Sequence, residues 1–377
     1  MGKRANGEGS VYKRADGRWG AALSYQDASG AMRRRMVYGA TQAEARIKLR
    51  ELRARIEAGV PVKDSTLTLA AWLDTWMTGS LPASDRRQAT VDLYSHIARR
   101  HLLPTLGSKR IDKIRPTDVE MLVVMKRQEG LAQSTVRTIY TVLRAALDTA
   151  VRDGLLTTNP TAAIRRPPVR RRDAAFLSVD DAQRLLEALA GERLEPLFRL
   201  MLSTGLRRGE ALGLHWEDVD LDRRQLRVRW TLTRTTAGLQ LGEPKTKLSR
   251  RVVPLPQSLV NVLEAHSEQQ KSEAVAIGSA WQNEDLVFAT EVGTFLEPRN
   301  VLRRFVTISR RAGLDDVHLH TLRHSTASFL LAAGVHIKVV QELLGHASYA
   351  ITADTYSHVA PEQRREAADR IEDSLDW

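Results

Sequence analysis

A proline- and arginine-rich segment divides this chain into parts that cannot share one continuous helical framework. The segment is NPTAAIRRPPVRRRDAAF, residues 159–176 of a chain of 377. Proline has no backbone N–H and disfavours helical conformation at the residue before it, so a helix that reaches this segment ends there. A chain of this length also suits two or three domains. We therefore expect a boundary here, with one domain over residues 67–165 and another over residues 174–377.

The part directly before this boundary has a helical pattern. Four stretches within residues 67–165 carry apolar residues at helical spacing and are joined by short connections, which predicts a compact helical bundle. Thr117, followed three residues later by Glu120, predicts a capping box at the start of the third helix. The basic residues of this bundle are candidate phosphate contacts, although a solvated charged face would carry the same residues. They are Arg99, Arg100, Lys109, Arg110 and Lys113.

The first 60 residues have the pattern of three short strands followed by a helix. The strands are GSVYKRA, RWGAALSYQ and AMRRRMVYG, separated by turns at Asp16-Gly17 and at DASG. Thr41 is the predicted N-cap of a helix with one apolar stripe, and Gly59 marks the end of that helix. We expect residues 1–60 to form a small twisted sheet with one helix.

Basic residues are concentrated on two of these strands. Arg33, Arg34 and Arg35 lie on the third strand, and Arg18 lies beside Trp19 on its neighbour. Such a surface could enter the major groove of DNA, and the alternative is a solvated face that is indifferent to sequence. The whole chain has 57 Lys+Arg against 45 Asp+Glu and a formal charge of +12, which suits a polyanionic partner.

The composition also sets limits on the class of protein. There is no cysteine, which excludes disulfides and thiolate metal sites. No apolar run is long enough to span a bilayer, and the opening MGKRANGEGSVYKRADGRWG contains no apolar signal core. We therefore expect a cytoplasmic protein with no membrane partner.

Residue types suited to phosphate chemistry gather after residue 174. HTLRH supplies His320 and Arg323, which are three residues apart and share one helical face. TGLRRGEALGL supplies Arg207, and LLGHASYAITADTYSHV supplies His346 and Tyr356. An arginine fork gives a phosphate two hydrogen bonds and keeps its charge, so two arginines could hold both non-bridging oxygens while the tyrosine attacks the phosphorus.

The remaining pattern of this region is mostly helical. We predict one three-strand sheet from roughly Gln225 to Pro254, with Lys245 near a turn of that sheet. Gly334 is expected to end the helix that carries Arg323, and the closing PEQRREAADRIEDSLDW has the pattern of an amphipathic helix. The predicted fold class is therefore multidomain and mainly α, with small β-sheets.

Together these strings resemble the tyrosine recombinase family, specifically the lambda-type integrases of phages and mobile elements. TGLRRGEALGLHWEDVDL is similar to the first family box, HLHTLRHSTASFLLAAG to the second and LLGHASYAITADTYSHV to the closing segment, and the similarity covers nearly the whole chain. The residues that the resemblance implies for catalysis, with the supporting acid last, are Arg207, Lys245, His320, Arg323, His346, Tyr356 and Glu210. Lys247 is the alternative for the lysine, and Arg208 is the alternative for the first arginine.

The resemblance implies a transesterification without ATP, metal or cofactor. Tyr356 would displace a deoxyribose 5′ oxygen and form a 3′-phosphotyrosyl link to DNA, and a second strand's 5′ hydroxyl would reverse this step through a Holliday junction. His320 is the candidate base for the tyrosine, and Lys245 is the candidate acid for the departing oxygen. His346 would donate a hydrogen bond to the phosphate.

The resemblance also implies roles for the predicted domains. Residues 1–60 would bind arm-type sites, and residues 67–165, a SAM-like core-binding domain, would clasp the duplex at core-type sites opposite residues 174–377. A homotetramer on DNA would form, with the closing helix packing in trans, together with a host DNA-bending factor and a directionality factor. The expected location is the chromosome in the cytoplasm of a bacterial host. The linker arginines that would follow the DNA backbone are Arg170, Arg171 and Arg172.

Three other interpretations are open at this point. A chromosome-dimer or plasmid resolvase of the same family typically lacks the first domain, so the basic strands before residue 60 count against it. A DNA-binding regulator without chemistry would have no need of Tyr356. Zinc binding by His320 and His324 is disfavoured because HTLRH lacks the glutamate of the metalloprotease helix.

Overall fold

The computed structural model describes residues 9–26, 32–57, 67–170, 175–244 and 249–345. The chain divides into two compact units, residues 1–170 and 171–377. The division falls inside the proline- and arginine-rich segment. The boundaries at residues 60, 67, 165 and 174 remain predictions.

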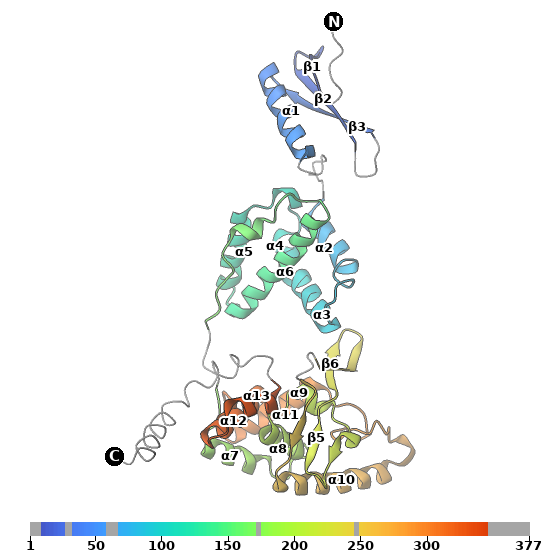
Figure 1. The fold of residues 1–377 in the computed structure, drawn as a ribbon, viewed down its shortest axis with the longest axis vertical. Coiled ribbons are helices and arrows are strands. Elements are labelled where there is room, and N and C mark those ends of the chain that lie inside the picture. Colours follow the sequence, from blue (N-terminus) through green and yellow to red (C-terminus); the bar gives the residue numbers. More distant parts are fainter. Residues whose placement is uncertain (1–8, 27–31, 58–66, 171–174, 245–248, 346–377) are drawn as a thin grey trace, which may run out of the picture. The chain divides into compact units, whose positions relative to one another are not determined.

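The first unit begins with an antiparallel sheet of three strands in the order β1-β2-β3, with helix α1 along one side (Figure 1). The predicted sheet and helix are therefore confirmed. In the register of β2 and β3, Trp19 lies opposite Gly39 and Ser24 lies opposite Arg34. The elements are β1 (Ser10–Lys13), β2 (Trp19–Gln26), β3 (Met32–Gly39) and α1 (Gln42–Glu57).

Local sequence explains the turn between β1 and β2 and the start of α1. At the first turn Gly17 has φ of +80°, which suits glycine, and Asp16 Oδ1 accepts a hydrogen bond from Arg18 N at 3.1 Å. At the helix start Thr41 Oγ1 accepts from Glu44 N at 3.2 Å, as the sequence predicts. The predicted turn at DASG and the helix end at Gly59 lie outside the described residues.

The predicted helical bundle follows within the same unit. A π-helical turn (Ala98–Leu102) connects α3 to α4, so residues 88–106 form one continuous helical run. Short 3₁₀ turns lie at Ile111–Lys113 and Pro160–Ala163. The helices are α2 (Leu69–Thr78), α3 (Gln88–Ile97), α4 (Leu103–Leu106), α5 (Pro116–Gln128) and α6 (Gln133–Arg152).

The core of the bundle forms around α6, which places eight buried residues on one side. Trp72 is buried against it and donates its indole N–H to Ala146 O at 2.9 Å. The predicted capping box of the third helix is wrong. Pro116 starts α5 one residue before Thr117, so Arg115 is the N-cap and Asp118 Oδ2 accepts from Arg115 N at 2.7 Å.

The second unit is mostly helical, as predicted, and packs its helices around a small antiparallel sheet in the order β4-β5-β8. A 3₁₀ turn (Trp216–Asp218) leads into this sheet, and another (Gly278–Ala280) follows α10. The strands are β4 (Val219–Asp220), β5 (Gln225–Arg227), β6 (Thr231–Thr235), β7 (Gly238–Gly242) and β8 (Val252–Pro254). The helices are α7 (Val179–Leu189), α8 (Glu195–Thr204), α9 (Arg208–Leu212), α10 (Gln257–Ile277), α11 (Pro298–Arg311), α12 (Leu319–Ala332) and α13 (Ile337–Leu344).

The prediction of one three-strand sheet between Gln225 and Pro254 is wrong in its connectivity. Among the described strands, β6 and β7 pair with each other as a hairpin that projects from the body of the unit (Figure 1). Strand β5, before the hairpin in the sequence, pairs with β8, which follows it. Helix α9 packs against β6 so closely that a Cβ at Gly209 would lie 2.7 Å from Leu232 O. The hairpin therefore packs against α9, the helix that follows Arg207.

The hydroxyl of Tyr140 in α6 holds the chain segment that follows this helix. This buried hydroxyl lies 2.8 Å from Thr161 O and 3.2 Å from Ile164 O. We expect Tyr140→Phe to lower the free energy of unfolding by about 1–2 kcal/mol, because a buried carbonyl loses its donor. The matched control is Tyr94→Phe, because Tyr94 makes its contacts with Trp76 and Arg86 through its ring. Equal urea midpoints for wild type and Tyr140→Phe would contradict the expectation.

Candidate active site

Arg323 occupies the centre of the second unit. It lies in α12, is only 2% exposed, and donates from Nη1 to Gly205 O and from Nη2 to Leu344 O, both at 2.6 Å. Gly205 ends α8 with φ of +64°, and a Cβ there would lie 2.4 Å from Leu344 Cδ2. The ends of α8 and α13 therefore meet around one guanidinium group.

Arg207 lies beside Arg323, at the N-cap of α9. Its Nη2 donates to Gly345 O at 3.0 Å, the carbonyl next to the one that Arg323 holds, and its Nη1 donates to Glu210 Oε1 at 2.7 Å. Glu210 Oε2 also accepts from Arg207 N at 3.0 Å, which completes the cap of α9. The structure thus brings together three of the predicted site residues, Arg207, Glu210 and Arg323. The side chain of Arg207 remains partly exposed to solvent.

Arg251 belongs to the same cluster, and the sequence prediction missed it. It lies directly before β8 and pairs with the buried Glu210 carboxylate at 3.1 Å. Burial acts to raise the pKa of Glu210, but Arg251 and Arg207 outweigh it and hold that pKa below its ordinary value. The only sequence signal was its place in the basic string SRRVVPL, which does not distinguish Arg251 from Arg250.

His320 and His324 lie one turn apart on α12, with ring centroids 4.6 Å apart. Burial, reinforced by Arg323 and Arg207, lowers the pKa of His320. Burial and His320 lower the pKa of His324 to about 4. Both rings are therefore neutral near pH 7, and His320 can accept a proton there. No group of three or more metal-ligating His, Cys, Asp or Glu occurs among the described residues.

The hydrogen bond of Arg208 is made outside this cluster. Its Nη1 lies 3.5 Å from Pro298 O, at the start of α11, and its side chain lines a cavity of about 410 Å³ that His320 also borders. Apolar side chains such as Leu206 and Leu302 form most of the remaining wall. Of the two neighbouring arginines, it is therefore Arg207 that joins Arg323.

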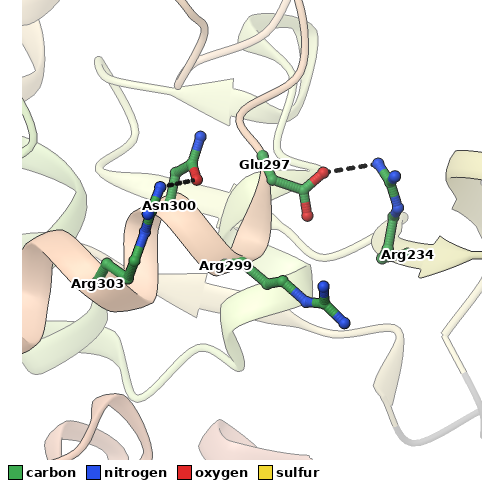
Figure 2. A pocket seen from close by; sticks show the side chains of 5 residues that line it. All are labelled: Arg234, Glu297, Arg299, Asn300 and Arg303. Carbon is green, nitrogen blue, oxygen red and sulfur yellow. Dashed lines mark hydrogen bonds and ion pairs between the residues drawn. The ribbon is translucent and has the colours of Figure 1, made fainter.

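A second recess, of about 370 Å³, lies between β6 and the start of α11 (Figure 2). Arg234 pairs with Glu297 at 2.7 Å, and Arg303 Nη2 donates to Asn300 Oδ1 at 2.7 Å, while the exposed Arg299 extends beneath Glu297 in this view. Three guanidinium groups and one carboxylate give the recess a net positive charge. Pro298, which lies between the lining residues Glu297 and Arg299 in the sequence, accepts a hydrogen bond from Arg208, and Arg208 borders the cavity at His320.

The predicted basic surface of the first sheet is divided by the register. Arg18 precedes Trp19 at one end of β2, whereas Arg33, Arg34 and Arg35 lie opposite residues 23–25 at the other, about 17 Å away along the strand. Arg34 lies on the exposed face, and the half-buried Arg35 is on the opposite face. These residues therefore do not form a single cluster.

The exposed face that carries Arg34 is otherwise aromatic and sulfur-rich. The hydroxyls of Tyr12 and Tyr38 lie 3.9 and 3.8 Å from Met36 Sδ, and the Arg14 guanidinium lies 4.7 Å from the Tyr38 ring centroid. Met36 and Tyr38 are about two-fifths exposed, at 40% and 42%. An open face of this kind can contact a partner with both rings and cations.

The predicted DNA contacts of the bundle fall into two groups. Arg99 and Arg100 are exposed on the π-helical turn, and Lys113 is exposed in the 3₁₀ turn. Lys109 instead pairs with Asp118, and Arg110 pairs with Asp112 at 2.7 Å, so both already have carboxylate partners.

Of the predicted linker arginines, Arg170 lies within the described residues. Arg170 is exposed, and its backbone N–H donates to Gln133 Oε1 at 2.9 Å. The predicted residues that lie outside the described part of the chain are Arg171, Arg172, Lys245, Lys247, His346 and Tyr356. Within the described part, none of the helices is both long and apolar enough to cross a membrane.

Known proteins are similar to this chain in sequence and in fold. Residues 175–363 match the phage integrase family, and residues 68–123 match the phage integrase N-terminal SAM-like domain. The tyrosine recombinase XerC-like protein of Caldanaerobacter subterraneus subsp. tengcongensis is 32% identical over 92% of this chain and 94% of that protein. An integrase of Saccharopolyspora erythraea is 26% identical over 98% of this chain and 97% of its own.

Two solved structures show the same fold. The Tn1549 transposon integrase in complex with transposon right end DNA has a TM-score of 0.68 and 19% identity, covering 81% of this chain and 99% of that one. A lambda integrase tetramer bound to a Holliday junction has a TM-score of 0.59 and 20% identity, covering 94% and 96%.

These matches identify the class of protein as a DNA recombinase that uses a tyrosine. The chain belongs to the phage integrase family. It is an enzyme that breaks and rejoins DNA in site-specific recombination.

The histidine pair predicts a loss of stability in acid. Between pH 6.5 and about 4 the unfolded chain protonates His324 while the folded chain does not, so the free energy of unfolding falls as pH is lowered through this window. We expect His324→Gln to make the melting temperature less dependent on pH between 6.5 and 4 than it is in wild type. The same dependence of melting temperature on pH in wild type and in His324→Gln would contradict this expectation.

Proposed function

We propose that this recombinase is an integrase, which inserts a phage or mobile element through a 3′-phosphotyrosyl intermediate on Tyr356. The observation that carries the proposal is that Arg207 and Arg323 hold adjacent backbone carbonyls, Gly345 O and Leu344 O, directly before His346. This arrangement connects the two guanidinium groups to the segment that leads to the tyrosine.

The arginines supply the electrostatic part of the reaction. A guanidinium group has five N–H donors, and the side-chain contacts of Arg207 to Glu210 and Gly345 engage two of them. Further donors of Arg207 can therefore bind a non-bridging oxygen of the scissile phosphate, with Arg323 beside it. Because both side chains are held before DNA arrives, they stabilise the charge that develops in the transition state without reorganising.

Proton transfers complete the exchange. The Tyr356 hydroxyl gives its proton to the neutral His320 as its oxygen forms a bond to phosphorus, and the bond from phosphorus to the 5′ oxygen breaks. Lys245 protonates that departing oxygen, and His346 donates a hydrogen bond to the phosphate. A 5′ hydroxyl of another strand then attacks the phosphotyrosine, which restores Tyr356 and seals the DNA.

The first domain favours an integrase over a resolvase. Residues 10–26 and 32–57 form a sheet and a helix, and the open face of the sheet carries Arg34, Met36 and Tyr38. A chain that binds core sites alone has no use for this face, so we assign it to arm-type DNA sites. A non-catalytic regulator would not require the arrangement of Arg207, Glu210 and Arg323.

Assembly and location follow from the same proposal. The lambda integrase of the same fold was solved as a tetramer bound to a Holliday junction, which supports a homotetramer on DNA for this chain. The closing segment, residues 361–377, would pack on a neighbouring subunit. The tetramer would act on the bacterial chromosome in the cytoplasm, together with a DNA-bending factor and a directionality factor.

Trapping of the covalent intermediate tests the nucleophile. Nicked duplexes taken from the DNA that flanks the coding region should accumulate a protein–DNA adduct with wild type and none with Tyr356→Phe. An adduct with Tyr356→Phe would show that the nucleophile is a different residue. If wild type binds these duplexes and forms no adduct on any of them, the enzymatic proposal fails.

The two neighbouring arginines give a matched comparison in the same assay. We expect Arg207→Gln to lower the cleavage rate about 10²- to 10³-fold, as for removal of a charge-stabilising donor. Arg208→Gln should cause a much smaller loss, because Arg208 points toward Pro298. Equal losses in the two variants would mean that the first arginine is misassigned.

Arg34 provides a test of the first domain. If Arg34 neutralises one phosphate, Arg34→Gln should reduce the slope of log K against log salt by about 0.9 for duplexes that carry an arm-type site. Arg46→Gln is the matched control, because Arg46 is an exposed arginine of α1 that is not part of the open face. An unchanged slope for Arg34→Gln, or equal changes in both variants, would contradict the assignment.

A further inference from the structure

We infer that Arg251 is a positioning residue of the recombination reaction, which holds Glu210 and the end of α13 so that Arg207 is presented to the scissile phosphate. The inference rests on the proposed function, because it assigns a role toward the same site. Arg251 touches no reacting atom in this account. It acts through Glu210 and through the backbone carbonyl of Leu343.

Three arginines hold three consecutive carbonyls at the C-terminus of α13. Arg251 Nε donates to Leu343 O at 2.5 Å, Arg323 Nη2 to Leu344 O at 2.6 Å and Arg207 Nη2 to Gly345 O at 3.0 Å. The last carbonyls of a helix have no partner within the helix and carry partial negative charge, so they are natural acceptors for guanidinium groups. We call these three hydrogen bonds the carbonyl clamp. The clamp ends one residue before His346.

Arg251 is much less open to a phosphate than Arg207, its neighbour in the carbonyl clamp. Its side chain is only 7% exposed, whereas that of Arg207 is 39% exposed. Its remaining contacts are Nη1 to Ser249 O at 3.1 Å and Nη2 to Glu210 Oε2 at 3.1 Å. A buried side chain with three fixed acceptors can orient its neighbours, but it cannot follow a substrate.

Glu210 connects the clamp to the first arginine. Its side chain is 3% exposed and accepts from Arg251 on Oε2 and from Arg207 on Oε1, so the two arginines share one buried carboxylate. Removal of Arg251 would leave Arg207 as the main partner of that charge and would pull its guanidinium group toward Glu210. The group would then be less available to a phosphate.

The backbone of Arg251 is itself anchored. Arg251 O accepts from Val228 N at 2.9 Å, and β8 follows directly and pairs with β5. The described chain resumes at Ser249, four residues after Lys245. Arg251 therefore links the sheet, the carboxylate that holds the first arginine, and α13.

Single-turnover cleavage of a nicked suicide duplex separates positioning from folding. With the duplex at saturating excess over protein, the amplitude of the adduct reports the fraction of competent protein, and the rate constant reports the geometry of the site. We expect Arg251→Gln to lower the rate constant about 100-fold, with the affinity for DNA changed less than about threefold, because small misplacements of reacting groups cost this much. A lower amplitude with an unchanged rate constant would show that Arg251 acts on folding alone and would overturn the inference.

Two further variants sharpen this test. Arg250→Gln removes a neighbouring arginine that is 54% exposed and pairs with Glu243, and it should keep the wild-type rate constant. Arg251→Lys keeps the charge beside Glu210 but cannot reach three acceptors, so we expect only partial recovery of the rate. Full recovery with lysine would show that charge alone is sufficient, which overturns the geometric role.

Hydrogen exchange tests the clamp without requiring catalysis. We expect amides of residues 337–345 to exchange faster in Arg251→Gln than in wild type or Arg250→Gln, because the end of α13 loses an anchor. Unchanged exchange would overturn the inference even if recombination proceeds as proposed. Absence of an adduct with wild type, together with faster exchange in Arg251→Gln, would sink the proposed function and leave the clamp supported.

Discussion

The hydrogen bonds from three arginines to the end of α13 are the interaction on which the rest of this site depends. They are made by residues 207, 251 and 323, which come from the start of α9, the approach to β8 and the middle of α12. No two of these elements are adjacent in the sequence, so the second unit must fold completely before the site exists. The small sheet and the surrounding helices serve to bring these three backbones to one helix end.

Such a cluster requires buried charge, which the fold tolerates because every charge has a partner. The desolvation of Glu210 is offset by two guanidinium groups, and Arg323 directs its own to two backbone carbonyls. Replacement of Glu210 would leave the buried guanidinium group of Arg251 without its carboxylate partner. This explains how a binding site for an anion can be kept assembled in the absence of the anion, with the polypeptide's own oxygen atoms as acceptors.

Sequence patterns predicted those features that depend on neighbouring residues. Asp16-Gly17 and Thr41 each act within three residues, and their turn and cap are as predicted. The predictions failed in two situations. In one, two neighbouring residues both favoured a helix start; in the other, the structure depended on contacts between segments far apart in the sequence. Pro116 started α5 ahead of Thr117, and the pairing of β5 with β8 depended on a partner beyond an intervening hairpin. Arg251 was missed because its link to Glu210 spans 41 positions and leaves no periodic trace in the sequence.

The geometry at Gly205 has a consequence for how this protein can vary. A β-carbon at that position would collide with Leu344 at 2.4 Å, and its φ of +64° is itself unfavourable for other residues. A replacement would strain the backbone at the end of α8 and force the buried Leu344 side chain to move, and Leu344 O is the acceptor that Arg323 holds. A residue with no side chain, and with no part in proton or phosphoryl transfer, therefore limits which descendants of this chain can remain active.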